Sequence, residues 1–252
     1  MIDHRSHDYP NLLQRWRAVA RAAGLKLEPF AEAGGYELFH LRTPALQATG
    51  GIYISAGIHG DEAASTEGLL AWAQKHAHDL ATWPLQIFPC LNPWGLVRNV
   101  RTNEQGIDLN RAFSRRQIPE IRGLHTVVGR RRFAAALHLH EDYDAQGIYL
   151  YEIRDNPPHW GEPLIAAAQK IIPADPRARI EDRVSRLGII RRRLDSLHIR
   201  RIGGLPEAIF FYRRGTPHCI TFETPSEFAL EIRIQAHVAV LDETLRLLGH
   251  SS

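Results

Sequence analysis

Apolar residues along the chain follow two spacings, one typical of helices and one typical of strands. From Pro10 to Ala23 they recur at helical spacing and Gly24 follows as a stop, which predicts an amphipathic helix. Further helices are predicted over 62–80, over 162–172 and in the C-terminal segment, where one stripe carries Ile234, Val238, Leu241, Leu245 and Leu248. Short apolar runs predict strands over Tyr36–Leu41, Gly51–Ala56, Leu85–Leu91, Phe133–His140, Gly147–Glu152 and His218–Glu223.

The alternation of strands and helices predicts a layered α/β fold with helices on both faces of the sheet. A chain of 252 residues can bury its core in one domain, so we interpret residues 1–252 as a single domain. Two segments lack a clear period: Pro93–Arg116 is loop-like, and 173–216 is expected to form irregular active-site loops. Thr224-Pro225-Ser226-Glu227 matches a capping box and predicts the start of the last helix.

The composition bears on the class of protein and on where in the cell it is expected. Hydrophobic residues make up 44% and charged residues 23%, as in globular proteins, and no apolar run reaches the roughly 18 residues of a membrane span. The first eight residues are polar and lack the apolar core of a signal peptide, so we expect a cytoplasmic protein. Cys90 and Cys219 lie in apolar, strand-like runs and are expected to be reduced core thiols. A disulfide between them is the alternative.

Arginine is clustered although the net charge is only +3. The clusters are Arg130–Arg132, Arg191–Arg193, Arg200–Arg201 and Arg213–Arg214. A nucleic-acid binder has such clusters, but here no aromatic residues are interleaved with them and no nucleic-acid motif is present. We therefore favour a solvated surface that attracts small acidic substrates, and predict no nucleic-acid or membrane partner.

The stretch Ser55-Ala56-Gly57-Ile58-His59-Gly60-Asp61-Glu62 carries the strongest chemical pattern. A short apolar strand runs into a turn with two glycines, and His59 and Glu62 leave that turn three residues apart. Zn²⁺ takes nitrogen and oxygen ligands and has about four of them. The pair therefore predicts part of a metal site and requires a third protein ligand elsewhere.

The strand that ends at His140 offers this third ligand. Because side chains alternate along a strand, His138 and His140 share one face and the leucines between them occupy the other. His140 lies nearer the strand end, where a metal would sit, so it is the predicted ligand. His138 could orient a ligand from one layer deeper. The alternative is a polar patch of two histidines without a metal.

Two further groups could act beside such a metal. Glu223 closes a predicted strand, and its carboxylate could take a proton from water and pass it to a leaving amine. It could also cap the following helix, because acidic side chains favour helix N-termini. Arg101, Asn110 and Arg111 follow another strand end and fit an anionic substrate group and an oxyanion, or else a salt-bridged exposed loop.

Five motifs in this order resemble the zinc carboxypeptidase family and its relatives, the succinylglutamate desuccinylase and aspartoacylase group. They are Gly57–Glu62, Asn92–Gly95, Gly106–Arg111, the strand of His140, and Thr221–Ser226, and they cover about residues 50–230. The resemblance implies an α/β fold with a central mixed β-sheet. It also implies that most of the chain forms one catalytic domain of this kind.

The resemblance assigns roles to the residues that match these motifs. It implies three protein ligands of a Zn²⁺ ion, which are His59, Glu62 and His140. Glu223 is the implied general base and acid, and Arg101 the group that polarises the scissile carbonyl. Asn110 and Arg111 are the implied clamp on a terminal carboxylate.

The leading hypothesis is a zinc metallocarboxypeptidase that hydrolyses the C-terminal amide bond of a small peptide. The first alternative is a zinc deacylase of N-acyl amino acids, which shares the motif around His59. The second is a non-catalytic binding protein with a decayed site, which we disfavour because no ligand or base is missing. One Zn²⁺ ion is expected. A second metal ion is an alternative near His125, His138, Glu141 and Asp142. The sequence does not determine the oligomeric state.

Overall fold

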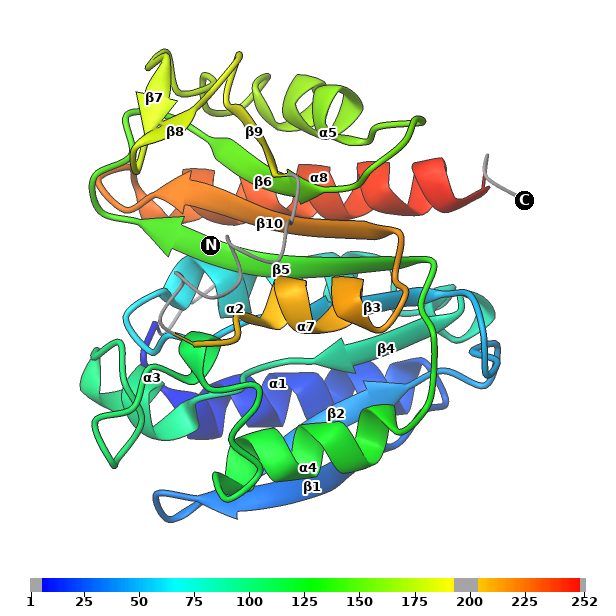
Figure 1. The fold of residues 1–252 in the computed structure, drawn as a ribbon. Helices are drawn as coiled ribbons and strands as arrows, with labels where there is room; N and C mark the ends of the chain where they lie inside the picture. The colour runs from blue at the N-terminus through cyan, green and yellow to red at the C-terminus, as the bar shows by residue number, and fades with distance from the viewer. Residues whose placement is uncertain (1–5, 193–203, 250–252) are drawn as a thin grey trace.

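The computed structural model describes residues 6–192 and 204–249 (Figure 1). The helices are α1 (Tyr9–Ala22), α2 (Ala63–Lys75), α3 (Pro93–Arg98), α4 (Pro119–Val128), α5 (Gly161–Ala168), α7 (Glu207–Arg213) and α8 (Leu230–Gly249). The strands are β1 (Leu27–Ala33), β2 (Tyr36–Arg42), β3 (Ile52–Ser55), β4 (Leu85–Phe88), β5 (Ala135–Asp142), β6 (Tyr149–Ile153), β7 (Arg179–Ile180), β8 (Arg183–Val184), β9 (Ile189–Arg192) and β10 (His218–Pro225).

Eight strands form one mixed sheet in the order β1-β2-β4-β3-β5-β10-β6-β9. The central strands β4, β3, β5 and β10 run parallel to one another. Antiparallel pairing joins β2 to β4 on one side and β6 to β10 on the other. The short strands β7 and β8 pair only with each other, as a small hairpin. The predicted α/β fold with a central mixed sheet is confirmed.

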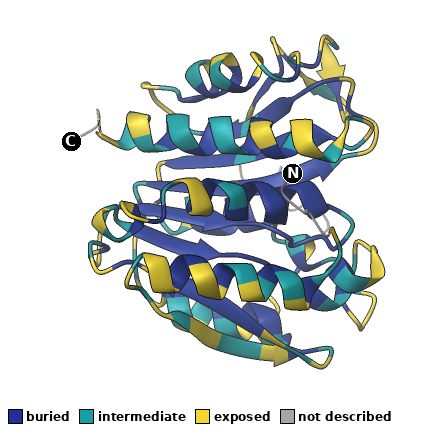
Figure 2. Cartoon of the chain, turned by 180° about the vertical axis from the view of Figure 1, so that it is seen from behind, coloured by how far each residue is buried: buried dark blue, intermediate teal, exposed yellow. Residues whose placement is uncertain are grey.

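Helices cover both faces of this sheet (Figures 1 and 2). On one face, α1, α2, α5 and α8 pack against the sheet in a core that includes Trp16, Trp72 and Leu241. On the other face, α4 and α7 pack against it in a second core that includes Leu124 and Phe211. Fully burying one such side chain contributes about 1.5–3 kcal/mol, so the two cores fix the sheet and its strand ends firmly.

Alternation along β5 and β10 decides which side chains reach the functional face. Leu137 and Leu139 of β5, with Phe222 of β10, enter the core beneath α2 and α8. His138 and His140 therefore point to the opposite face, as predicted from the two-residue period. Because β5 and β10 are parallel and pair Glu223 with His140, these two side chains lie side by side near the ends of both strands.

The structure corrects several predicted elements. Segment 173–216 is not irregular throughout: β7, β8, β9 and α7 lie within it, and 193–203 lie outside the described residues. The segment predicted as a loop after Asn92 begins with α3, where the Asn92 side chain accepts a hydrogen bond from Gly95 N. The capping box at 224–227 is wrong, because β10 pairs with β5 through Pro225 and α8 begins only at Leu230.

Among residues 6–192 and 204–249, no helix combines the length and the apolar character that crossing a membrane requires.

Candidate active site

The turn after β3 directs His59 and Glu62 toward the end of the sheet. Gly57 has φ +62°, a left-handed conformation that glycine adopts without strain. Gly60 packs so closely on α3 that a Cβ atom would lie 2.0 Å from the carbonyl carbon of Gly95. Glu62 occupies the N-cap position of α2 but makes no side-chain capping bond, so its carboxylate is free to serve the site.

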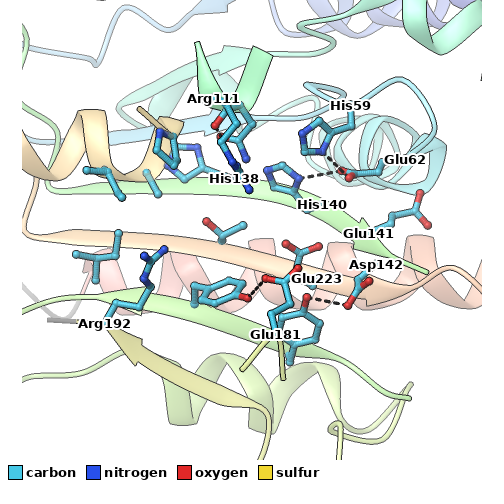
Figure 3. Close-up of a pocket in the computed structure, with 18 of the residues that line it drawn as sticks. His59, Glu62, Arg111, His138, His140, Glu141, Asp142, Glu181, Arg192 and Glu223 are labelled. Carbon is cyan, nitrogen blue, oxygen red and sulfur yellow. Dashed lines mark hydrogen bonds and ion pairs between the residues drawn. The ribbon is translucent and has the colours of Figure 1, made fainter. Parts of the chain in front are cut away.

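His59, Glu62 and His140 meet at the ends of β3 and β5 (Figure 3). The Nδ1 atom of His59 lies 2.6 Å from Glu62 Oε1, and the Nδ1 atom of His140 lies 2.9 Å from Glu62 Oε2. All three side chains are buried, and one ligand atom from each falls within 4.8 Å of the others. The three predicted metal ligands are therefore brought together, although they come from two separate parts of the sequence.

The chemistry of this donor set fits a metal ion. Two imidazole nitrogens and one carboxylate are typical ligands of catalytic zinc sites. Glu62 Oε2 has no well-directed hydrogen bond despite its burial, so a positive charge beside it is favourable. Although burial favours the neutral acid, His59 and His140 hold the pKa of Glu62 well below its usual range. The group can therefore offer an ionised carboxylate to a cation.

Asp108 fixes the orientation of the His59 ring. The Nε2 atom of His59 lies 3.1 Å from Asp108 Oδ1. An ionised carboxylate only accepts hydrogen bonds, so the proton of this bond is on Nε2, and the Nδ1 lone pair can bind a cation. Burial opposes a charge on His59, yet Glu62 and Asp108 raise its pKa to about 9. Asp108 was not predicted, although it lies within the Gly106–Arg111 motif.

The predicted anchors lie around this group. Arg101 donates from Nε and Nη2 to Asp108 Oδ2 at 3.2 and 3.1 Å, and its Nη1 lies 3.7 Å from Glu62 Oε1. Asn110 uses Oδ1 to accept a hydrogen bond from the backbone N–H of Glu207, which begins α7. Arg111 donates only to the carbonyl oxygen of Asn110 within the described residues, so its guanidinium remains available to an anion.

Glu223 faces the cleft from the end of β10. Its strand position lies directly across from His140 on one side and from Tyr149 on the other. Burial raises the pKa of this carboxyl well above its usual value, and the nearby carboxylate of Glu62 adds to the effect. Within the described ranges, its side chain has no hydrogen bond to another residue. The alternative that Glu223 caps the last helix is wrong, because α8 begins only at Leu230.

His138 was expected to be able to orient a metal ligand, but within the described residues its ring pairs with Glu207 and Ser55. Its Nδ1 atom lies 3.1 Å from Glu207 Oε2 and 3.2 Å from Ser55 Oγ. Tyr53 OH donates to Glu207 Oε1 at 2.5 Å. The pattern of the sequence gave no signal for Glu207, because α7 lies in the segment without a clear period. His138 thus belongs to a buried polar network that joins β3, β5 and α7.

The residues considered for a second metal do not gather into a second group. Glu141 accepts a hydrogen bond from Ala64 N and forms an ion pair with Arg233. The ring of His125 stacks on Phe210, with ring centroids 4.5 Å apart. In the part of the chain that the structure describes, His59, Glu62 and His140 form the one group of three such ligands.

These side chains line one cleft of about 290 Å³ (Figure 3). The metal group and Arg111 lie on one side of the Glu223 strand, and Arg101 lies 3.7 Å from Glu62 of that group. The far side is formed by β6, β9 and the β7–β8 hairpin, which contribute Tyr149, Tyr151, Glu181, Arg183 and Arg192. Of these five, Tyr151, Glu181, Arg183 and Arg192 were not predicted as site residues. The site therefore has a metal side that the motifs identify and a second side that they do not.

The comparisons with known proteins agree with this geometry. Residues 48–139 match the family described as succinylglutamate desuccinylase/aspartoacylase catalytic domain. Among curated proteins, none matches the chain. A proposed metallopeptidase from Shewanella amazonensis has a similar structure, with a TM-score of 0.82 and 25% sequence identity over 96% of this chain and 94% of that one.

Two more distant structures share the fold. A metallo-carboxypeptidase from Burkholderia cenocepacia has a TM-score of 0.69 and 15% identity, over 95% of this chain and 68% of that one. A metallo-carboxypeptidase from Pseudomonas aeruginosa has a TM-score of 0.65 and 18% identity, over 94% and 68% respectively. The family match, the fold and the site together indicate a hydrolase of the carboxypeptidase-like kind with a group that can bind a metal. The resemblance to the zinc carboxypeptidase family and to the succinylglutamate desuccinylase and aspartoacylase group is supported by the family match over residues 48–139 and by the shared fold.

Proposed function

We propose that the chain is a Zn²⁺-dependent carboxypeptidase, with one catalytic domain over residues 1–252, that hydrolyses the C-terminal amide bond of a small peptide. One observation carries the proposal. The Nδ1 atoms of His59 and His140 approach the two oxygens of the Glu62 carboxylate, at the strand end that Glu223 shares. Three ligands, an adjacent carboxylate and arginines in one cleft are the parts that such a reaction needs.

His59, Glu62 and His140 are the proposed ligands of one ion. Three protein ligands leave a further position on a catalytic zinc for water or substrate. When bound, Zn²⁺ supplies Lewis-acid chemistry, which polarises a carbonyl group and acidifies water. Asp108 supports this arrangement, because its hydrogen bond to His59 Nε2 orients the ring.

Glu223 is the proposed general base and acid. Its carboxylate takes a proton from the attacking water while the water oxygen bonds to the carbonyl carbon. It then gives that proton to the amine nitrogen while the C–N bond breaks, so that the products are a carboxylic acid and a free amine. Its buried position beside His140 and its lack of a side-chain hydrogen bond leave it available for both transfers.

Arg101, Asn110 and Arg111 are the proposed substrate contacts. Arg101 lies 3.7 Å from Glu62 and can donate to the oxyanion that forms on the carbonyl oxygen. Arg111, with the amide of Asn110, can hold the terminal carboxylate, since guanidinium groups pair with carboxylates in bidentate fashion. A fixed carboxylate restricts hydrolysis to the last amide bond.

A deacylase of N-acyl amino acids is the second candidate. The match of residues 48–139 to the succinylglutamate desuccinylase/aspartoacylase domain favours it. Both reactions break an amide bond next to an amino acid with a free carboxylate. They differ in the group on the other side of that bond, which is a peptide in one case and a simple acyl group in the other.

A metal analysis with a substrate panel tests both candidates. The protein is purified without chelator, its metal content is measured, and N-acylated dipeptides are compared with N-acetyl and N-succinyl amino acids. Release of the C-terminal residue from dipeptides supports the carboxypeptidase, and release from acyl amino acids alone supports the deacylase. A protein without bound metal that stays inactive after Zn²⁺ is added contradicts both.

A further inference from the structure

The first turn of α2 is capped by a residue from another strand. Glu62 occupies the N-cap position of this helix, where a side-chain oxygen usually accepts a hydrogen bond from the second or third backbone N–H of the helix. The Glu62 carboxylate instead faces His59 through Oε1 and His140 through Oε2. The backbone N–H groups that begin α2 therefore need an acceptor from elsewhere in the fold.

Glu141 supplies this acceptor from β5. Its Oε1 accepts a hydrogen bond of 2.6 Å from the backbone N–H of Ala64, the second residue of α2. Glu141 directly follows His140 in the strand, and alternation turns its side chain toward α2 and α8 (Figure 3). A carboxylate at a helix N-terminus is also favoured by the helix dipole. One strand thus carries a proposed ligand and, one residue on, the cap of the helix that begins beside Glu62.

An arginine of α8 holds the Glu141 carboxylate in place. Arg233 Nη1 forms an ion pair with Glu141 Oε2, and Arg233 Nε donates to the carbonyl oxygen of Phe228 at 2.8 Å. The Glu141 side chain is fully buried and that of Arg233 is 16% exposed, so water competes little for this pair. Charge-assisted hydrogen bonds of this kind are short and directional. Glu141 is therefore a fixed point to which the start of α2 is attached.

A serine connects the first turn of α2 to the turn of His59. Ser65, which follows Ala64, donates from Oγ to the carbonyl oxygen of Glu62 at 2.7 Å. The same Oγ accepts a hydrogen bond of 3.2 Å from the backbone N–H of Gly57, two residues before His59. The position of this first turn of the helix therefore affects both proposed ligands that leave the turn after β3.

We propose that Glu141 is a positioning residue, which caps α2 in place of Glu62 and so leaves the Glu62 carboxylate free for a metal ion. Without Glu141, the backbone N–H of Ala64 would be left unsatisfied in a buried position. The Glu62 carboxylate would then turn back to cap its own helix and would leave His59 and His140. The role toward the metal rests on the proposed function, whereas the exchange of caps concerns the fold alone.

Zinc affinity tests this role without a substrate. The dissociation constant of the full chain for Zn²⁺ is measured by competition with a chelating dye. Glu141→Ala removes the cap, and we expect the dissociation constant to rise about 10- to 100-fold, the range for residues that orient metal ligands. Glu141→Gln loses the ion pair with Arg233 but keeps an oxygen that can accept from Ala64 N, so it should recover most of this affinity.

A double variant separates the cap from folding. Glu141→Ala leaves the Arg233 charge buried without its partner, which can itself destabilise the chain strongly. Glu141→Met combined with Arg233→Met replaces the pair by apolar side chains of similar size, a change that buried ion pairs often tolerate. This variant still lacks the acceptor for Ala64 N, so its zinc affinity should fall as far as that of Glu141→Ala.

Asp242→Asn is the matched control. Asp242 of α8 pairs with Lys75 at 2.6 Å and with His76 at 2.7 Å, at the other end of α2. Its replacement weakens the contact between the same two helices away from the metal group, so it should lower the melting temperature without changing zinc affinity. Wild-type zinc affinity in the double variant overturns the proposal. So does a loss in Glu141→Gln or in Asp242→Asn as large as that in Glu141→Ala.

Crystal structures of the metal-free double variant and of Asp242→Asn separate this inference from the proposed function. In the double variant, a Glu62 carboxylate oxygen should lie about 3 Å from Ala64 N, a hydrogen-bond distance. In Asp242→Asn it should still face His59 and His140. If the wild type binds no Zn²⁺ but Glu62 moves in this way, the hydrolase proposal fails and the capping role stands. If Glu62 keeps its place in the double variant, the inference fails even when hydrolysis is found.

Discussion

The two sides of the cleft are built in different ways. The metal side uses His59, Glu62 and His140, which lie at the ends of central parallel strands or in the turn that follows. The far side uses β9, at the edge of the sheet, and the small β7–β8 hairpin. Central strands are held by neighbouring strands on both sides, whereas among the described strands β9 pairs with β6 alone. The proposed metal ligands are therefore on the more firmly held side of the cleft, and the far side is at the edge of the sheet.

The difference between the two sides matters most for the groups proposed to carry out the reaction. Ligands and a base must stay within a few tenths of an ångström of their working positions, which strands in the centre of a sheet can provide. The expected effects below decrease from the metal group to residues further from it.

Loss of a ligand should have the largest effect. His140→Ala removes one of three proposed ligands and leaves Glu62 without its partner at 2.9 Å. We expect metal content to fall to background and hydrolysis to fall below detection. Metal content is measured by mass spectrometry on protein that shows unchanged circular dichroism. His76→Ala, which removes a histidine that pairs with Asp242 on α8, is the control and should retain the metal. A metal content in His140→Ala equal to that of the wild type would remove His140 from the site.

Replacement of the proposed base should spare the metal. Glu223→Gln preserves the size of the side chain but removes its ability to take a proton. We expect kcat to fall by about 10²- to 10⁴-fold, the usual contribution of general acid–base catalysis, with metal content unchanged. Steady-state kinetics with the best substrate of the panel measures the loss. Normal turnover in this variant would show that another group acts as the base.

Sequence patterns predicted the metal side because its determinants are local. The turn around His59 and the alternation along the strand of His140 need only a few adjacent residues to be recognised. Glu207 and Arg192 lack such a signal, because α7 and β9 are short and lie in or beside an arginine-rich segment of poor period. Only tertiary pairing, β9 with β6 and α7 over β5, brings Arg192 to the cleft and Glu207 to the buried network with His138.

The capping-box prediction failed for the same reason. Thr224 to Glu227 has the local pattern of a helix start, but the chain there completes the sheet instead. Pro225 still pairs with Asp142, and Ser226 N donates to the carbonyl oxygen of that residue. The parallel partner strand therefore outweighed the local preference, as tertiary contacts often do.

The network beneath α7 should affect stability more than metal binding. Glu207→Ala leaves Tyr53 OH and His138 without their shared buried partner. We expect the free energy of unfolding to fall by about 3 kcal/mol, since breaking a buried polar pair is costly. Tyr53→Phe, which removes one of these contacts, should cost about 1 kcal/mol. Urea unfolding measures both values, and metal content should stay at the wild-type level. Loss of the metal in Glu207→Ala would show that this network and the metal group are coupled.

The contact between α4 and α7 should give the smallest effect, a dependence of stability on pH. His125 of α4 stacks on Phe210 of α7, and both ring nitrogens lack hydrogen-bond partners in the described part of the chain. Burial, reinforced by the charges of Arg116 and Arg214, lowers the pKa of His125 to about 4. The unfolded chain, with a histidine pKa near 6.5, then binds more protons than the folded chain between about pH 6.5 and 4. Stability therefore falls as the pH falls through this window, by about 1 kcal/mol at pH 5 after allowance for partial exposure.

His125→Phe tests this contact, because it keeps an aromatic ring against Phe210 and removes the titration. The free energy of unfolding, measured by urea at pH 7.5 and at pH 5, should drop less in this variant than in the wild type. His78→Gln, at an exposed position after α2, should leave the wild-type difference unchanged. An equal drop in His125→Phe and wild type would mean that the acid sensitivity of the fold lies elsewhere. A smaller drop in His125→Phe would show that this histidine, in the contact between α4 and α7, carries part of the dependence of stability on pH.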